Sequence, residues 1–103
     1  MNDELTIFRN ALKNKYIPKY ILCGIMSSMI LSKSIFKHND DIPVFLKEII
    51  NVEYKEYVIK SRTLIMARST REIYNMSNEN LFLTKNKLYE YIQKEIKKEK
   101  NDK

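Results

Sequence analysis

Residues 54–71 hold five basic side chains against a single acid, Glu56, and positive charge concentrates in this stretch and at both ends of the chain. Lysine side chains neutralise phosphate groups, and arginine can also read a guanine edge through two parallel hydrogen bonds. The whole chain of 103 residues carries a net charge of +6, and such a basic protein attracts polyanions through counterion release. The side chains of this stretch therefore predict a surface that binds nucleic acid.

The elements that would position these side chains are helices, because apolar residues recur at intervals of three and four. Asp3 can cap the first helix, and Pro18 suits the first turn of the second. Gly24 would let a neighbouring element approach that second helix closely. Four helices are expected before residue 70, over 3–15, from 18 to between 33 and 36, 42–50 and 54–69.

A β-hairpin is expected after the basic helix. Two short β-like runs, 71–76 and 80–84, lie on either side of a polar turn. Alternation would place Ile73 and Leu81 on the core side of this hairpin. The second run leads directly into another helical pattern, for which Thr84 is a suitable N-terminal cap.

The order helix, helix, basic helix, hairpin, helix is that of a winged helix-turn-helix. We therefore expect an α+β, mostly helical fold with a three-helix core, a two-stranded wing and a C-terminal helix. The length allows one domain over residues 1–103, with 1–15 as an N-terminal helix or arm and 97–103 as a frayed basic tail.

The expected DNA contacts fall into three groups, and each group has a structural alternative. The alternatives are a solvated helix face, a hairpin that only closes the core, and an apolar N-terminal helix that forms a dimer. At the wing, the charge of Glu79 opposes phosphate and favours the alternative. The predicted contacts are Lys55, Lys60, Arg62 and Thr63 on the basic helix; Arg71, Ser77, Asn78, Asn80 and Lys85 on or beside the wing; and Arg9, Lys13, Lys15 and Lys19 in the N-terminal segment.

The last helix carries a second apolar repeat. Leu88, Ile92 and Ile96 follow one another at four-residue intervals and therefore share one face. We expect this face in a homodimer interface, with packing inside a single chain as the alternative. A symmetric dimer would suit paired DNA half-sites.

The string Leu81-Phe82-Leu83-Thr84, followed by Leu88 and Ile92, is similar to the close of the wing in bacterial winged-helix regulators. Residues 85–87 here lack the glycine that those proteins often have. Small size, basic charge and a wing without an effector domain also resemble the relaxosome accessory proteins of clostridial conjugative plasmids. This resemblance implies a dimer that binds double-stranded DNA at an origin of transfer, with a relaxase as a further partner.

Three other functions fit the same residues. A plasmid or phage transcriptional repressor would share the DNA-binding chemistry. A helical interaction module, such as an inhibitor of a host protein, would explain seven tyrosines, a residue type enriched at interfaces. RNA binding is the third, although the chain has neither an aromatic ribonucleoprotein motif nor a GxxG loop.

Catalytic and metal chemistry find little support in the sequence. The single Cys23 and single His38 cannot build a cysteine or histidine metal site, and no glycine-rich phosphate loop occurs. We therefore expect no enzyme, no metal, no cofactor and no small-molecule effector. The absence of a long apolar run and an acidic start predict a cytoplasmic protein without a membrane span or signal peptide.

Overall fold

The computed structural model describes residues 3–101, and the regular structure in that range is entirely helical. Residues 1–2 and 102–103, at the ends of the predicted N-terminal segment and tail, lie outside the described residues. The expectation of an α+β winged helix-turn-helix is therefore wrong, because residues 3–101 contain no strand. The helices are α1 (Asp3–Leu12), α2 (Lys19–Leu31), the 3₁₀ helix η1 (Asn39–Asp41), α3 (Ile42–Ile50), α4 (Glu56–Ile59), α5 (Arg62–Tyr74) and α6 (Asn78–Asn101).

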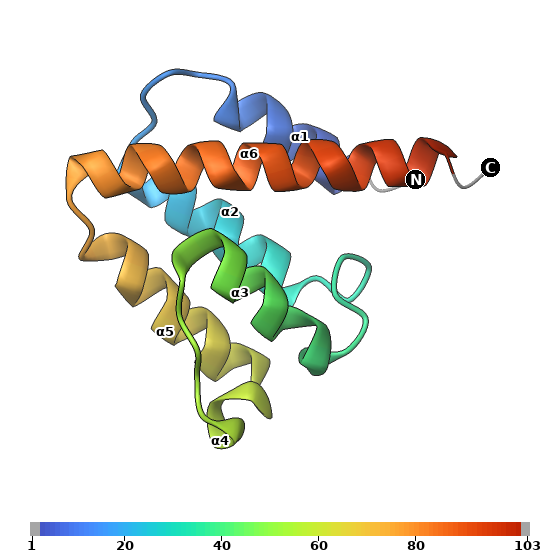
Figure 1. Cartoon of the computed structure of the whole chain (residues 1–103), viewed down its shortest axis with the longest axis vertical. Coiled ribbons are helices and arrows are strands. Elements are labelled where there is room, and N and C mark those ends of the chain that lie inside the picture. Colours follow the sequence, from blue (N-terminus) through green and yellow to red (C-terminus); the bar gives the residue numbers. More distant parts are fainter. Residues whose placement is uncertain (1–2, 102–103) are drawn as a thin grey trace.

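The long helix α6 crosses the molecule, and α1 lies along it (Figure 1). Helix α2 packs against α5 over much of its length, and α3 contacts both α5 and α6. The N-terminal ends of α2 and α6 and the C-terminal end of α5 meet on the same side, at the left of Figure 1. The molecule is flat, with principal dimensions of 36 × 32 × 17 Å.

The predicted hairpin is the junction of two helices. On α5, Ile65, Ser69 and Ile73 are all buried, and their spacing of four residues is that of a helix. Polar Ser69 interrupts the apolar pattern in the sequence, so the run beyond it resembles a separate strand. The two β-like runs therefore belong to the last turn of α5 with its exit and to the first turns of α6.

Serine side chains mark where the last two helices begin. The Ser61 hydroxyl accepts a hydrogen bond from the Leu64 amide at 3.2 Å, and it caps α5. The Ser77 hydroxyl does the same for the Asn80 amide, also at 3.2 Å, at the start of α6. Thr84 lies inside α6 and does not cap it. The helix expected over 54–69 is thus divided into α4 and α5 at Ser61.

Other details also differ from the expectations. The tail predicted to fray from residue 97 continues as α6 to Asn101. Gly24 is exposed, and a Cβ atom built there would have no neighbour within 4 Å, so it permits no close approach. Helices α2 and α3 have nearly the predicted bounds.

The core lies between α1, α2, α3, α5 and α6. Phe45 of α3 packs between the rings of Phe36 and Tyr91, with centroid distances of 4.9 and 4.8 Å. The three residues predicted for a dimer interface are in this core: Leu88 and Ile92 are 0% exposed, and Ile96 is 8% exposed. The expected placement of these side chains in an interface is wrong, because α6 uses this face to pack within one chain.

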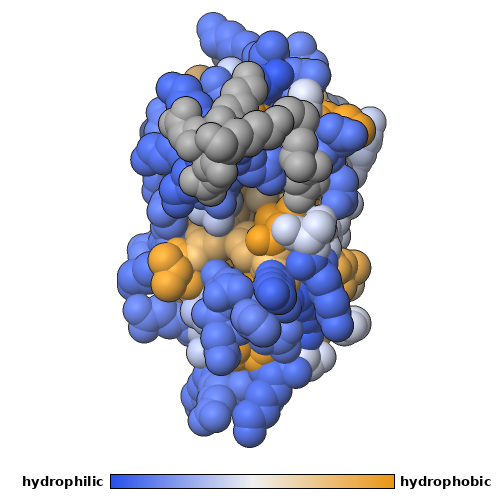
Figure 2. All heavy atoms as spheres, turned by 90° about the vertical axis from the view of Figure 1, so that its right-hand side faces the viewer, coloured by the Kyte–Doolittle hydropathy of each residue, from blue (hydrophilic) through white to orange (hydrophobic). Residues whose placement is uncertain are grey.

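One face of the molecule, which points to the right in Figure 1, is mainly hydrophilic with an apolar band across its middle (Figure 2). This face lies opposite the side on which the N-terminal ends of α2 and α6 meet.

Candidate functional site

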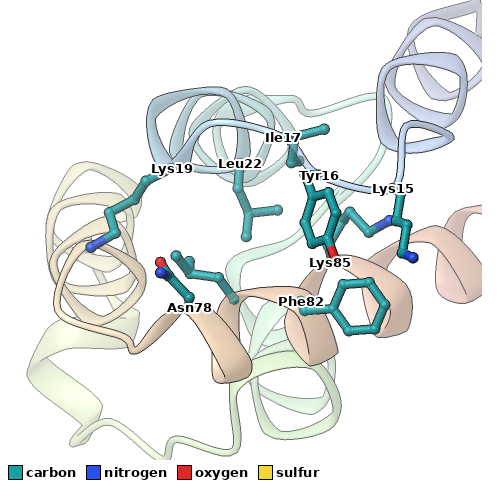
Figure 3. A pocket seen from close by; sticks show the side chains of 9 residues that line it. Lys15, Tyr16, Ile17, Lys19, Leu22, Asn78, Phe82 and Lys85 are labelled. Atoms are coloured by element: carbon teal, nitrogen blue, oxygen red, sulfur yellow. The ribbon is translucent and has the colours of Figure 1, made fainter.

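A cavity of about 310 Å³ opens where the α1–α2 connection passes the first turns of α2 and α6 (Figure 3). Leu22 and Leu81 supply apolar lining, and Leu22 is almost completely buried. Aromatic rings and lysine side chains form most of the remaining boundary. We call it the aromatic–lysine cavity; its further lining includes Lys15, Tyr16, Lys19, Asn78, Phe82 and Lys85.

Two aromatic rings stand at the mouth of the cavity. Tyr16 comes from the α1–α2 connection and is 77% exposed, whereas Phe82 comes from α6 and is 37% exposed. Their ring centroids are 6.3 Å apart, and the ring planes are tilted by 42°. The rings are in contact with each other, and both remain partly exposed to a partner at the mouth of the cavity.

Each of three lysines at the cavity lies over an aromatic ring. The Nζ atom of Lys15 is 5.5 Å from the ring centroid of Tyr16, and that of Lys85 is 5.3 Å from the centroid of Phe82. Lys19 extends over Tyr74, the last residue of α5, at 5.1 Å. These are cation–π distances, so ammonium groups and rings share one surface.

Two of these ammonium groups are held by backbone carbonyl groups. Lys85 is buried, and its Nζ donates to the Asn14 carbonyl oxygen, just beyond α1, at 2.8 Å. Lys19 Nζ donates to the Tyr74 carbonyl oxygen at 2.6 Å. Cations are favourable at helix C-termini, so both lysines also stabilise the fold.

The electrostatics of this side favour an anion. Helices α2 and α6 begin here, and helix N-termini carry partial positive charge. Residues 13–22 contain three lysines and no acid. Glu79 follows Asn78 in the first turn of α6 but does not line the cavity. The balance of charge around the cavity is therefore positive.

The structure brings together residues predicted for two different DNA-binding elements. Lys15 and Lys19 of the N-terminal group line one cavity with Asn78 and Lys85 of the supposed wing. Of the other residues in these two groups, Lys13, Arg71, Ser77 and Asn80 are exposed, whereas Arg9 is partly buried and donates to Gln93 of α6.

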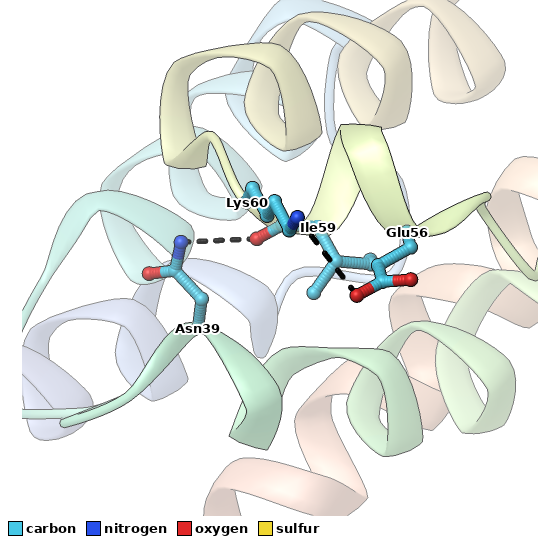
Figure 4. A network of polar contacts seen from close by, with 4 residues as sticks. All are labelled: Asn39, Glu56, Ile59 and Lys60. Carbon is cyan, nitrogen blue, oxygen red and sulfur yellow. Dashed lines mark hydrogen bonds and ion pairs between the residues drawn. The ribbon is translucent and has the colours of Figure 1, made fainter.

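The predicted basic helix is largely separate from this cavity. Lys55, Lys60 and Thr63 are exposed around α4 and the start of α5, at the bottom of Figure 1. Lys60 forms an exposed ion pair with Glu56 at 3.9 Å (Figure 4). Arg68, on the next turns of α5, donates to the Tyr57 hydroxyl at 3.2 Å.

Arg62 was predicted to face solvent and contact DNA. In the structure its guanidinium group is instead directed into the fold. Its Nε atom donates to the Asn39 side chain at 2.8 Å, and Nη1 donates to the Ile30 and Ser32 carbonyl oxygens at 3.0 and 3.3 Å. Nη2 donates to the Phe36 carbonyl oxygen. Arg62 thus closes the C-terminus of α2.

Asn39 links this arginine to α4. The Asn39 amide nitrogen donates to the Ile59 carbonyl oxygen at 2.9 Å (Figure 4), while its side-chain oxygen accepts from Arg62. The Asn39 side chain and three backbone carbonyl groups therefore accept hydrogen bonds from Arg62. These are the donors with which Arg62 was expected to read DNA.

The two rings at the cavity were missed as functional residues. From the sequence, Tyr16 was assigned no role, and Phe82 was placed in the string that is similar to the close of a wing. The signal was present in the sequence KNKYIPKY of residues 13–20, where lysines alternate with aromatic residues. Exposed aromatic side chains among cations are typical of surfaces that bind single-stranded nucleic acid.

The described residues also bear on metal binding and on membrane crossing. Residues 3–101 contain no group of three or more His, Cys, Asp or Glu side chains placed to hold a metal ion. No helix within that range combines the length and apolarity that crossing a membrane requires. Burial raises the pKa of the Cys23 thiol, although nearby Lys19 acts in the opposite direction.

Comparisons with known proteins identify no relative: no family model matches the chain, and neither the curated proteins nor the solved structures include a match.

Proposed function

We propose that this protein binds nucleic acid through the side of the molecule that carries the aromatic–lysine cavity. One observation carries the proposal: Lys15, Lys19 and Lys85 line a single cavity, and each of them lies over an aromatic ring. Ammonium groups neutralise phosphates, and ring faces stack on bases. A nucleic acid is the polymer that presents both partners at a regular short spacing.

Exposure of the rings supports the same function. Tyr16, Tyr20 and Tyr74 are each more than 60% exposed around the point where α2 begins and α5 ends. Large exposed apolar groups gathered in one region are typical of binding surfaces. The surrounding lysines favour an anionic partner over an apolar one.

The proposal keeps nucleic acid as the predicted partner. It moves the binding surface from the basic helix and the wing to the aromatic–lysine cavity. The winged-helix resemblance depended on a hairpin that the fold does not contain. A role at a transfer origin, a role at a promoter and a homodimer stay predictions from the sequence.

A second candidate is duplex DNA bound by the exposed cations of α4 and α5. The supporting observation is that Lys55, Lys60, Arg68 and Arg71 are all exposed along this one stretch. Arg62, the central residue of the predicted reading face, is however occupied by the fold.

Fluorescence anisotropy with labelled oligonucleotides tests the proposal. Binding should weaken steeply as salt is raised, by about 10³-fold or more between 50 and 200 mM if six or more phosphates are contacted. Lys15→Glu should weaken binding at least about tenfold, since it reverses a charge at the cavity.

Lys33→Glu is the matched control, because Lys33 is equally an exposed lysine and lies beyond the opposite end of α2. Lys60→Glu tests the second candidate. If Lys60→Glu weakens binding and Lys15→Glu does not, the interface is on α4 and α5. If the unaltered protein binds neither single-stranded nor duplex nucleic acid at low salt, as DNA or as RNA, the proposed function is wrong.

A further inference from the structure

The dimensions of the aromatic–lysine cavity limit what can enter it. Its volume of about 310 Å³ is at the lower end of the range for small-molecule sites, which is enough for one base and part of its sugar. In a duplex, both flat faces of a base are covered by its neighbours and only its edges reach a groove. A base can therefore enter this cavity only when it is unpaired.

The lining of the cavity matches the surface of an unpaired base. Leu22 and Leu81 give it an apolar lining, and the partly exposed rings of Tyr16 and Phe82 stand at its mouth. Stacking on an aromatic side chain tolerates any base, because every base has a π-face. Asn78 adds an amide that can donate and accept hydrogen bonds at the edge of the base.

The lysines are placed for the phosphates on both sides of such a base. In Figure 3, Lys19 and Asn78 lie at one end of the cavity and Lys15 lies at the other. Lys19 uses one N–H on the Tyr74 carbonyl oxygen, and an ammonium group has three, so donors remain for a phosphate. A single strand can thus run across the mouth while one base enters the cavity.

We infer that the aromatic–lysine cavity holds one unpaired base of a single-stranded nucleic acid, stacked against Tyr16 and Phe82, with its flanking phosphates at Lys15 and Lys19. The inference rests on the proposed function and narrows it. The protein then prefers a single strand to a duplex of the same sequence. Base identity contributes little, because stacking and phosphate contacts are shared by all bases.

Competition between strands tests the preference. The probes are a labelled oligo(dT), an oligo(U) and a duplex, each of about 12 nucleotides, a length within the site sizes of single-strand binding domains. Both single strands should bind more tightly than the duplex. Oligo(dT) and oligo(U) differ in the sugar and in the methyl group of the base. The probe that binds more tightly therefore shows whether the preferred single strand is DNA or RNA.

Ring substitutions test the cavity itself. Tyr16→Ala should weaken single-strand binding about 5- to 150-fold, the equivalent of one lost stacking contact, and leave duplex binding nearly unchanged. Tyr16→Phe keeps the ring and should bind as the unaltered protein does. Tyr57→Ala is the matched control, because Tyr57 is an exposed tyrosine on α4. Tyr16 is itself largely exposed, so its removal should leave the fold intact.

Intrinsic fluorescence gives an independent measure of stacking. The chain has no tryptophan, so its emission comes from tyrosine, and a stacked base quenches that emission. Oligo(dT) should quench the unaltered protein more than it quenches Tyr16→Ala. Equal binding of single strand and duplex, with Tyr16→Ala and Tyr57→Ala alike, would overturn the inference and leave the proposed function standing. Failure to bind any probe would overturn both.

Discussion

Arg62 at the start of α5 donates a hydrogen bond from Nη1 to the Ile30 carbonyl oxygen near the end of α2, at 3.0 Å. The carbonyl groups of the last helical turn have no partner within their own helix. Arg62 supplies a hydrogen-bond donor to this turn. It also donates to the Phe36 carbonyl oxygen and the Asn39 side chain, which follow α2 in the sequence. A side chain with the chemistry of a DNA contact is therefore a structural link between α2, η1 and α5.

Replacement of this arginine should destabilise the fold. Arg62→Ala leaves carbonyl groups of the α2 terminus and the Asn39 side chain without their donor, and we expect a loss of about 2–4 kcal/mol in the free energy of unfolding. Arg68→Ala is the matched control, because Arg68 is exposed and should cost less than about 1 kcal/mol. Urea denaturation measures both. Equal midpoints for the two variants would show that the Arg62 contacts contribute nothing.

The position of Ile92 leads to a second prediction. Ile92→Asp should prevent folding of the single chain, since it places a carboxylate in a site that is 0% exposed. Far-ultraviolet circular dichroism should show a loss of helix. Lys94→Asp changes an exposed residue of the same helix and should retain the helical spectrum. A folded, monomeric Ile92→Asp protein would instead place this residue in an interface between chains.

Gly24 offers a stabilising substitution. It lies in the middle of α2, where glycine costs more conformational entropy than alanine, and a Cβ atom there meets no neighbour within 4 Å. Gly24→Ala should therefore raise the free energy of unfolding by about 0.5–1 kcal/mol. The urea midpoint should move to higher concentration. A lower midpoint would mean that a close neighbour does occupy this position.

Tyr91 should make stability depend on alkaline pH. Burial, followed by the charges of Glu95, Glu48 and Asp41, raises the pKa of Tyr91 from 10.0 to about 12. The folded protein thus holds this proton more tightly than the unfolded chain does. The resulting stability is fully present below pH 10 and is lost as pH rises through 12.

The measurement compares the unaltered protein with Tyr91→Phe, which keeps the ring beside Phe45 and removes the proton. Between pH 10 and 12, the unaltered protein should lose more stability than the variant in urea denaturation. Parallel loss in both proteins would assign the alkaline sensitivity to other groups.

Strongly periodic helices were predictable from the sequence. Helix α3 has the predicted bounds because Ile42, Phe45 and Ile49 repeat at helical spacing between a polar break and Asn51. Asn51 ends this helix with a positive φ of 53°, a conformation that asparagine tolerates. Local sequence and tertiary packing agree in this part of the chain.

The hairpin error has a specific cause, which is polar residues on buried helical faces. Ser69 and Thr84 are 0% and 5% exposed, so the apolar stripes of α5 and α6 are interrupted in the sequence but continuous in space. Each interruption left a short apolar run that fits a strand as well as a helix. Packing of α5 on α2 and of α6 on α1 decides between them.

The candidate site was predictable in part. The sequence identified the lysines but not their grouping, because Lys15 and Lys85 are far apart in the chain and meet only after α6 packs along α1. Burial of Lys85 was equally hidden, since its partner is a backbone carbonyl of residue 14. A pattern of charge predicts an anionic partner but cannot distinguish a binding lysine from one that caps a helix.

Chemical-shift mapping tests the central claim most directly. Oligo(dT) added to isotope-labelled protein should shift the amide NMR signals of residues 14–22 and 76–86, which surround the aromatic–lysine cavity. Signals of residues 55–71 should move little, because α4 and the start of α5 lie apart from it. Shifts confined to residues 55–71, or an unchanged spectrum at low salt, would contradict a nucleic-acid site at the cavity.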